Sequence, residues 1–394
     1  MALAPALATR LDAAVDDAFA DLRGLALTLH AHPELRFEEH QAAGWITALV
    51  TARGHAVERP LGGLDTALRA RAGGPGGPRV AVLAEYDALP EIGHACGHNL
   101  IAAAGVGAFL AVASVLDGLD PGASVDLLGT PAEEGGGGKI TLLDAGVFAG
   151  VDCAMMFHPF DRDLLAHPCL ANVWLTMRFT GRPSHAAAAP WDGASALTGC
   201  LQTFSLIDSQ RVHFRDGVRV HGYIQDGGQA VNIIPERAVA EFSVRARSVD
   251  ELERVRAIVE RCARGAALAC GVEVEIAARR GYKDMATNLP LARALGRHLE
   301  ALGRHPRETD DRVGSGSTDM GDVSHAVPAI HPWLAIVDEG EALCHQRAFA
   351  VAAASETGLE TMRDAARAMA RTAAEFLSDA TLRAEVEAAF RGEG

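Results

Sequence analysis

The sequence predicts an α/β protein made of two domains, and three observations lead to that prediction. The chain has 394 residues, whereas a single domain usually holds about 100–200. Several short, continuous apolar runs are separated by helical stretches, which is typical of a mostly parallel sheet covered by helices. The middle of the chain has a different order of strands and helices, which indicates a second domain inserted into the first.

Four continuous apolar runs predict the strands of the main sheet. They cover residues 79–84, 124–128, 153–157 and 329–337. The run at 79–84 follows a Gly- and Pro-rich turn. Before them, apolar residues at helical spacing predict an amphipathic helix over residues 11–30. The uncharged stretch from Leu100 to Leu116 is at the short end of what a membrane span needs, so it predicts a buried helix of the core.

The middle of the chain predicts a ferredoxin-like unit, because its elements follow the order strand, helix, strand, strand, helix, strand. The strands are expected at residues 173–179, 217–224, 237–246 and 272–276, and the helices at 194–207 and 250–268. Ser248 and Glu251 form a capping box that starts the second helix. We therefore predict a catalytic domain formed by residues 1–171 and 288–394, with residues 172–287 as the inserted domain.

The charge and the cysteine content argue against several classes of protein. With 51 acidic and 36 basic residues, the net charge of −15 argues against nucleic-acid binding, which needs a basic surface. The seven cysteines are an odd number without a dense pairing pattern, which is typical of a reducing compartment. No signal peptide or membrane span is recognisable, so we expect a cytoplasmic protein with neither a nucleic acid nor a membrane as its partner.

Acidic and imidazole side chains directly follow three of the predicted core strands. Glu85 and Asp87 follow the first strand, Glu133 and Glu134 follow the second, and His158 follows the third. In open α/β sheets, ligands bind outside the carboxyl ends of the strands. We therefore expect these side chains to meet at one edge of the sheet and to form a functional site there.

Further metal-binding side chains lie near the same predicted edge. Cys96 and His98 occupy the loop before the buried helix, and His345 follows the last strand. Taken singly, each of these residues is more often structural, but a set of cysteine, histidine and carboxylate donors suits Zn²⁺ or a neighbouring transition metal. One tetrahedral ion needs only four ligands, so the larger set predicts two ions that share a ligand.

The neighbouring acidic residues can divide the remaining chemistry. Asp87 can orient a metal-bound imidazole by accepting a hydrogen bond from the ring nitrogen that does not bind the metal. Of the pair Glu133 and Glu134, one can bind a metal while the other accepts a proton from water. This pattern predicts that a carboxylate takes a proton from metal-bound water.

Six motifs, in this order, resemble a known family. They are HAHPEL (30–35), AEYDALPEIGHACGHNLI (84–101), TPAEEGGGGK (130–139), GRPSHAAAAPWDGASAL (181–197), VNIIPERA (231–238) and GSTDMGDVSHAVPAIHP (316–332). The chain resembles the dinuclear zinc metallopeptidases and amidohydrolases that include aminoacylase, plant auxin-conjugate hydrolases and bacterial aminobenzoyl-glutamate hydrolase. The Glu-Tyr-Asp, His-Asn and Ser-Thr-Asp-Met-Gly forms are most similar to the aminobenzoyl-glutamate hydrolase and dipeptidase-like branch.

The resemblance implies a zinc-exopeptidase-like core that hydrolyses a small N-acyl amino acid, an aminobenzoyl-glutamate-like conjugate or a dipeptide. It implies two divalent ions, with Zn²⁺ expected and Mn²⁺ or Co²⁺ as alternatives. Glu133 is implied as the general base, with Cys96 as the bridging ligand. The implied metal ligands are Cys96, His98, Glu134, His158 and His345. Cys344, next to His345, departs from the family pattern. His331 and His325 therefore remain alternatives to His345 as the C-terminal metal ligand.

For the inserted domain, the resemblance implies a lid that also forms a homodimer. His185 would reach the active site of the partner subunit and stabilise the oxyanion. Asn232 and Arg245 would hold a carboxylate of the substrate, because arginine suits bidentate pairing.

Three alternatives to hydrolysis are open at this point. The first is a binding or scaffold protein that keeps the fold but has a catalytically inactive site. The segment GGGGK at residues 135–139 would be a phosphate-binding loop, although Ile140 follows where Ser or Thr is required. Cys96 would be a redox thiol, although no C-x-x-C motif accompanies it.

Overall fold

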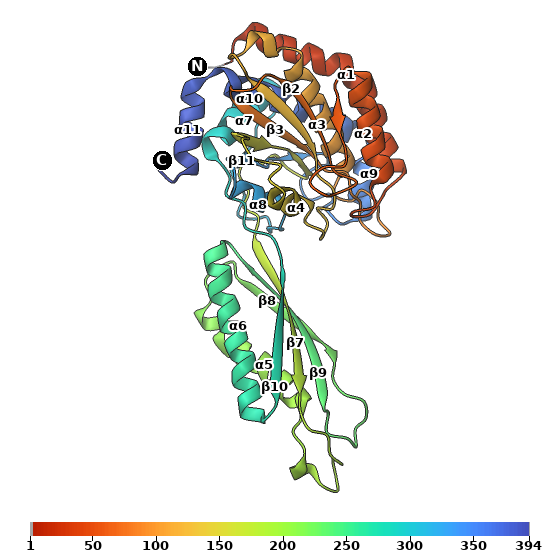
Figure 1. The fold of residues 1–394 in the computed structure, drawn as a ribbon, viewed down its shortest axis with the longest axis vertical. Helices are drawn as coiled ribbons and strands as arrows, with labels where there is room; N and C mark the ends of the chain where they lie inside the picture. Colours follow the sequence, from red (N-terminus) through yellow and green to blue (C-terminus); the bar gives the residue numbers. More distant parts are fainter. Residues whose placement is uncertain (1–2, 394) are drawn as a thin grey trace. The chain divides into compact units, whose positions relative to one another are not determined.

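The computed structural model describes residues 3–393, which form two compact units. The core unit contains the described residues up to Pro168, Ala286–Ser315 and the described residues from Asp322 onward. The inserted unit contains Cys169–Met285 and the short segment Gly316–Gly321. Figure 1 shows the mixed helices and strands of the first unit and the open sheet of the second.

A six-stranded sheet forms the centre of the core unit. Its order is β1 (Val57–Glu58), β2 (Leu68–Gly73), β4 (Ser124–Gly129), β3 (Arg79–Ala84), β5 (Cys153–Met155) and β11 (Ala329–Ile330). The four strands from β4 to β11 are parallel, whereas β1 and β2 form an antiparallel edge. The predicted mostly parallel α/β fold is therefore confirmed, and the antiparallel edge is an addition to it.

The predicted strand at residues 329–337 is wrong as a single element. After β11, the chain is interrupted at His331 and Pro332, and it resumes as β12 (Trp333–Ala335). Pro332 has no backbone N–H to donate, so it contributes no donor to a hydrogen-bond ladder at this point. β12 pairs instead with β6 (His158–Phe160) in a separate two-stranded parallel sheet.

Helix α3 (His98–Ala113) is the buried helix predicted from the apolar stretch, and it packs against β3 and β4. Gly105 permits this close packing, because a Cβ atom there would lie 2.8 Å from the carbonyl oxygen of Leu83. Helices α1 (Pro5–Ala31) and α10 (Glu356–Ser378) pack against α3 in turn (Figure 1). No helix within residues 3–393 is long and apolar enough to cross a membrane.

The other helices are short or lie at the periphery of these elements. They are α2 (His40–Ala52), α4 (Gly138–Asp144), α7 (Leu289–Ala301), α8 (Met320–Ser324), α9 (Arg347–Ala352) and α11 (Ala380–Phe390). Three 3₁₀ turns complete the set: η1 (Leu116–Gly118), η2 (Pro190–Asp192) and η3 (Arg211–His213). Helix α4 begins directly after the glycine-rich segment, and this position matters for the site described below.

The inserted unit has the strand and helix order of a ferredoxin-like fold. Its elements are β7 (Ala171–Thr180), α5 (Ala196–Gln210), β8 (Arg219–Asp226), β9 (Arg237–Ala246), α6 (Val249–Cys270) and β10 (Glu273–Arg280). The antiparallel sheet has the order β10-β7-β9-β8, and both helices pack on it (Figure 1). Ser248 caps α6 by accepting a hydrogen bond from the Glu251 backbone N–H at 3.3 Å, as the capping box predicts.

Candidate metal centre

The residues expected at the carboxyl edge of the sheet come together in the core unit. Asp87 follows β3, Glu133 and Glu134 follow β4, and His158 opens β6. His98 is the first residue of α3 and lies directly after Cys96 and Gly97. The structure thus gathers side chains from four separate segments, because the parallel strands end at the same edge.

Three groups of side chains place their donor atoms within 4.8 Å of one another. Cys96 with His98 and His158 forms one group, and Cys96 with Glu134 and His345 forms another. The third contains His98, Glu133 and Glu134. Cys96, His98 and Glu134 each belong to two of the three groups, so the groups overlap and form one continuous set of donors.

Several buried polar atoms of this centre have no hydrogen-bond partner among the described residues. They include Nε2 of His98, Oε1 of Glu134 and Oε2 of Glu85. The first two atoms lie 3.9 Å apart, so they face the same point. Buried polar atoms are nearly always paired in folded proteins. Unpaired nitrogen and carboxylate donors of this kind fit a divalent ion, which would satisfy them.

Oxygen acceptors fix the tautomers of two of the histidines. Nδ1–H of His98 donates to the carbonyl and to Oδ1 of Asp87, at 3.0 and 3.1 Å. Nδ1–H of His158 donates to the carbonyl oxygen of Pro159 at 2.7 Å. In both rings the Nε2 lone pair remains for a metal. The position of Asp87 next to His98 is compatible with the predicted orienting role.

Asp87 also holds Glu134, because its Oδ2 accepts the Glu134 backbone N–H at 2.9 Å. Burial raises the pKa of the Asp87 carboxyl, but its hydrogen bonds and the charges of His98 and Lys139 outweigh burial and hold that pKa below its usual value. Asp87 is therefore a carboxylate that links one candidate ligand to the loop of another.

Lys139 forms an ion pair that the sequence did not reveal. Its Nζ lies 2.5 Å from Oε1 of Glu85, and both side chains are almost completely buried. The other oxygen of Glu85 lies 3.5 Å from Nε2 of His98. The interpretation of residues 135–139 as a phosphate-binding loop is therefore wrong, because the lysine that would bind phosphate is committed to a buried carboxylate. A strand-end Glu and a lysine after a glycine-rich turn were the only signals for this pair.

His345 belongs to a donor group with Cys96 and Glu134. Its Nε2 is 3.7 Å from Oε2 of Glu134, and its backbone N–H donates to the Ala95 carbonyl at 3.0 Å. His331 is buried, and its Nδ1 accepts a hydrogen bond from Nε1–H of Trp333 at 3.2 Å. Within residues 3–393, neither His331 nor His325 belongs to a donor group.

Cys344 lies beside the centre without joining a donor group of the described chain. Its Sγ is 3.8 Å from the carbonyl oxygen of Pro159. A hydrogen bond with Cys344, together with burial and the charge of Glu134, raises the pKa of the Cys96 thiol well above its usual value. A bound metal cation would favour the thiolate instead.

The three predicted residues of the inserted unit fall at two places. His185 and Asn232 lie close together, since Ala186 N–H donates to the Asn232 carbonyl at 3.0 Å. Arg245 lies near the far end of β9 and opposite Asn172 on β7. Eight residues of strand separate Arg237 from Arg245, about 27 Å at 3.4 Å per residue. Within one chain, Asn232 and Arg245 therefore do not contact the same small molecule.

Arg245 is half-buried, and burial lowers the pKa of its guanidinium. Its hydrogen-bond partner is the hydroxyl of Ser317, which accepts from Nη1 at 3.3 Å. No carboxylate pairs with Arg245 in the part of the chain that the structure describes. A partly desolvated guanidinium of this kind suits a carboxylate ligand.

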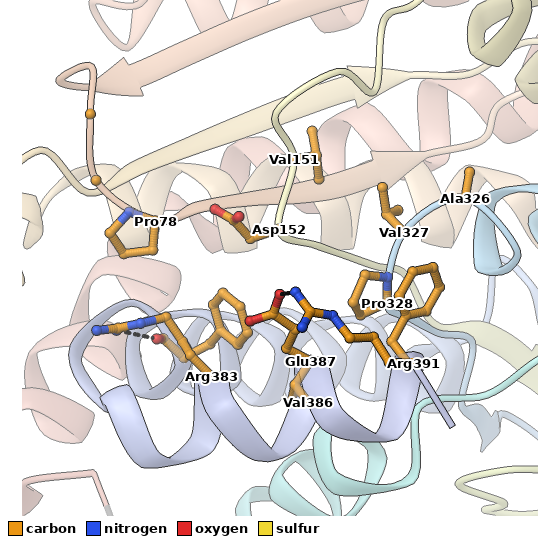
Figure 2. A pocket seen from close by; sticks show the side chains of 14 residues that line it. Pro78, Val151, Asp152, Ala326, Val327, Pro328, Arg383, Val386, Glu387 and Arg391 are labelled. Atoms are coloured by element: carbon orange, nitrogen blue, oxygen red, sulfur yellow. Dashed lines mark hydrogen bonds and ion pairs between the residues drawn. The ribbon is translucent and has the colours of Figure 1, made fainter. Parts of the chain in front are cut away.

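A cavity of about 660 Å³ lies at the opposite edge of the main sheet (Figure 2). Its lining includes Pro78, Asp152 and Pro328, which directly precede parallel strands, and the face of α11. Figure 2 shows Arg391 paired with Glu387 along that helix. None of the three donor groups of the described residues reaches this cavity.

The fold and the donor set define a metal-dependent hydrolase with an α/β core. Residues 81–375 match peptidase family M20/M25/M40, and the chain belongs to that family. It is 39% identical to the Xaa-Arg dipeptidase of Mus musculus over 378 residues, covering 92% of this chain and 87% of that protein. It is 32% identical to a chain of the p-aminobenzoyl-glutamate hydrolase of Escherichia coli over 291 residues, covering 69% of this chain and 60% of that one.

Solved structures show the same fold. A dinuclear metal binding peptidase of the M20 family from Bacillus subtilis superposes with a TM-score of 0.74 at 21% identity, covering 92% of this chain and 99% of that one. An aminobenzoyl-glutamate utilization protein from Klebsiella pneumoniae gives 0.71 at 19% identity, covering 93% and 98%. The predicted family is thus confirmed, and the chain is a metallohydrolase that acts on amide or peptide bonds.

Proposed function

We propose that this enzyme hydrolyses a small dipeptide or N-acyl amino acid by means of two divalent ions. The observation that carries the proposal is the overlap of the three donor groups at Cys96, His98 and Glu134. The proposed ligands are Cys96, His98, Glu134, His158 and His345, with Cys96 shared between the ions. Zn²⁺ is the proposed resident ion because cysteine and histidine donors suit it, and Mn²⁺ and Co²⁺ are the alternatives.

Glu133 is the proposed general base. Bound divalent ions polarise the scissile carbonyl group and lower the pKa of water. Glu133 lies in the donor group with His98 and Glu134, and the residue is 9% exposed. It accepts the proton of the attacking water and then delivers it to the leaving amine. Asp87 keeps His98 and the Glu134 backbone in place during both steps.

The proposed substrate carries a free carboxylate, which Arg245 binds. Support comes from the half-buried guanidinium of Arg245, whose hydrogen-bond partner is a neutral hydroxyl group. The name of the mouse relative supports a dipeptide with a basic C-terminal residue, and the net charge of −15 favours such a cationic substrate over an anionic one. Aminobenzoyl-glutamate-like conjugates are the alternative, after the Escherichia coli relative.

We also propose a cytoplasmic homodimer that forms through the inserted unit. Support for a dimer comes from the length of β9, which lies between Arg245 and the loop that carries Asn232. One small substrate can contact both residues only if they come from two chains. His185 would then act from the partner together with Asn232. The loop next to them exposes Trp191 and Val231, which are apolar residues that an interface would cover. The seven free cysteines support a reducing compartment.

The test compares wild type with Glu133→Gln on a panel of dipeptides, N-acyl amino acids and aryl amides. The wild type is expected to hydrolyse at least one class and to contain two metal ions per chain by elemental analysis. Glu133→Gln should lower kcat by about 10²–10⁴-fold, because a general base contributes that much, while the metal content stays the same. Wild-type protein without turnover on the whole panel would favour the inactive scaffold. A Glu133→Gln rate within tenfold of wild type would contradict the role of Glu133.

A further inference from the structure

The first of the six motifs has no part in the hydrolysis described so far. The segment that contains it contacts the chain directly after β3 and after β4. Leu35 pairs with Ala88 as a parallel bridge, and Ala88 N–H donates to the Glu34 carbonyl at 2.9 Å. A guanidinium N–H of Arg36 donates to the Glu134 carbonyl at 3.2 Å. The segment therefore contacts both loops that carry the acidic residues of the site.

Glu39 lies at the end of this segment and is completely buried. Its Oε1 accepts the backbone N–H of Ala132 at 2.9 Å. Its Oε2 has no hydrogen-bond partner in the described part of the chain. The two residues are 93 positions apart in the sequence, so this contact joins the N-terminal segment to the loop between β4 and α4.

Ala132 occupies a conformation that its side chain disfavours. Its φ is +63°, in the left-handed region that glycine adopts most readily. Its carbonyl accepts two further hydrogen bonds, from Gly136 N–H at 3.1 Å and Gly137 N–H at 2.8 Å. Ala132 is thus the centre of a tight turn, and a strained residue of this kind persists only where its surroundings fix it.

Two buried carboxyl groups hold the backbone on both sides of Glu133. Glu39 accepts the N–H of Ala132, and Asp87 accepts the N–H of Glu134, each at 2.9 Å. Burial, together with the charge of Asp87, raises the pKa of Glu39 to about 7. Each group accepts a backbone N–H of this loop, so each can hold the loop that carries the general base without binding a metal.

We propose that Glu39 is a positioning residue, which holds the turn at Ala132 so that Glu133 and Glu134 keep their places at the metal centre. The proposal rests on the proposed function of Glu133 and Glu134. It predicts that an oxygen acceptor at position 39 matters, and that a negative charge there does not. Glutamine keeps the acceptor, whereas methionine and alanine remove it.

The experiment compares Glu39→Gln, Glu39→Met and Glu39→Ala with wild type, and uses Glu38→Ala as the matched control because Glu38 is the exposed neighbour. Hydrogen exchange of the peptide covering residues 130–137 is measured by mass spectrometry on zinc-loaded protein, with α3 as the internal reference. Methionine and alanine should speed exchange in this peptide about tenfold or more and leave α3 unchanged. Glutamine and the control should match wild type.

Turnover of the best substrate of the panel provides the second measurement. Glu39→Met and Glu39→Ala should lower kcat by about 10–100-fold, as the loss of a group that orients a ligand does, with KM within about threefold and two metal ions retained. Glu39→Gln should restore kcat to within about threefold.

Unchanged hydrogen exchange at residues 130–137 in both the methionine and the alanine variant would overturn the positioning role. A glutamine variant that loses as much exchange protection and kcat as those two variants would overturn it as well. If neither acceptor-free variant folds while glutamine does, Glu39 supports the fold and the proposal is wrong. Absence of wild-type turnover would count against the proposed function alone, because the exchange measurement does not depend on activity.

Discussion

Replacing Lys139 with methionine is expected to destabilise the core unit strongly. The Lys139 and Glu85 side chains are 0% and 1% exposed and their charged atoms lie 2.5 Å apart. Methionine fills a similar volume but leaves the Glu85 carboxylate buried without its cation. Removing one partner of a buried ion pair costs about 3–5 kcal/mol. For a unit of this size, 1 kcal/mol lowers Tm by about 2–4 °C, so the expected fall is about 6–20 °C.

The measurement is a calorimetric melt of metal-free protein, in which no ion can compensate Glu85. The double variant Lys139→Met, Glu85→Gln should recover much of the lost Tm, because no charge then remains buried. Arg264→Met is the control, since its pair with Glu260 is on the surface and should matter by less than about 1 kcal/mol. A single variant that melts with wild type, or a double variant that melts no higher than the single one, would refute this explanation of the pair.

Two further predictions concern single side chains. Burial and the charge of Asp87 raise the pKa of Glu39 from 4.5 to about 7, so its stabilising contribution is complete below pH 4.5 and is lost as pH rises through 7. The change in the free energy of unfolding amounts to about 3 kcal/mol at most. Glu39→Gln should therefore make the urea midpoint depend less on pH between pH 5 and 8 than it does in wild type. The same pH dependence in both proteins would contradict this. Arg245→Met should raise KM about 10–100-fold for substrates with a free carboxylate but not for amidated substrates. Arg219→Met on the neighbouring strand is the control and should leave KM unchanged for both substrate types. An equal rise in KM for both substrate types in Arg245→Met would argue against carboxylate binding.

The sequence predicted those parts of the fold whose signals are local. Apolar runs at residues 79–84 and 124–128 correspond to β3 and β4, and the capping box at Ser248 marks the start of α6. The rule that ligands bind at the carboxyl ends of parallel strands then predicted that Asp87, Glu133 and His158 would meet. Each of these predictions needs only neighbouring residues and a general rule of topology.

The remaining features depend on contacts between distant residues. β2 was not predicted because Arg69 and Arg71 interrupt its apolar pattern, and only the structure shows that Arg71 pairs with the buried Asp126 on β4, at 2.6 Å. The burial of Lys139 depends on Glu85, which is 54 positions away. A lysine after four glycines is usually exposed, so no local pattern could have identified this pair.

The same distant contacts connect stability to catalysis in this molecule. Glu85, Asp87, Glu133 and Glu134 bring four carboxyl groups to one largely buried edge of the sheet, while Lys139 is the buried lysine paired there. Carboxylates kept apart from water need cations close by. The imidazole of His98, between Asp87 and Glu134, supplies one such partner when it is protonated. Divalent ions at the donor groups would supply the rest, so the proposed metal ligands would also belong to the charge balance of the folded core.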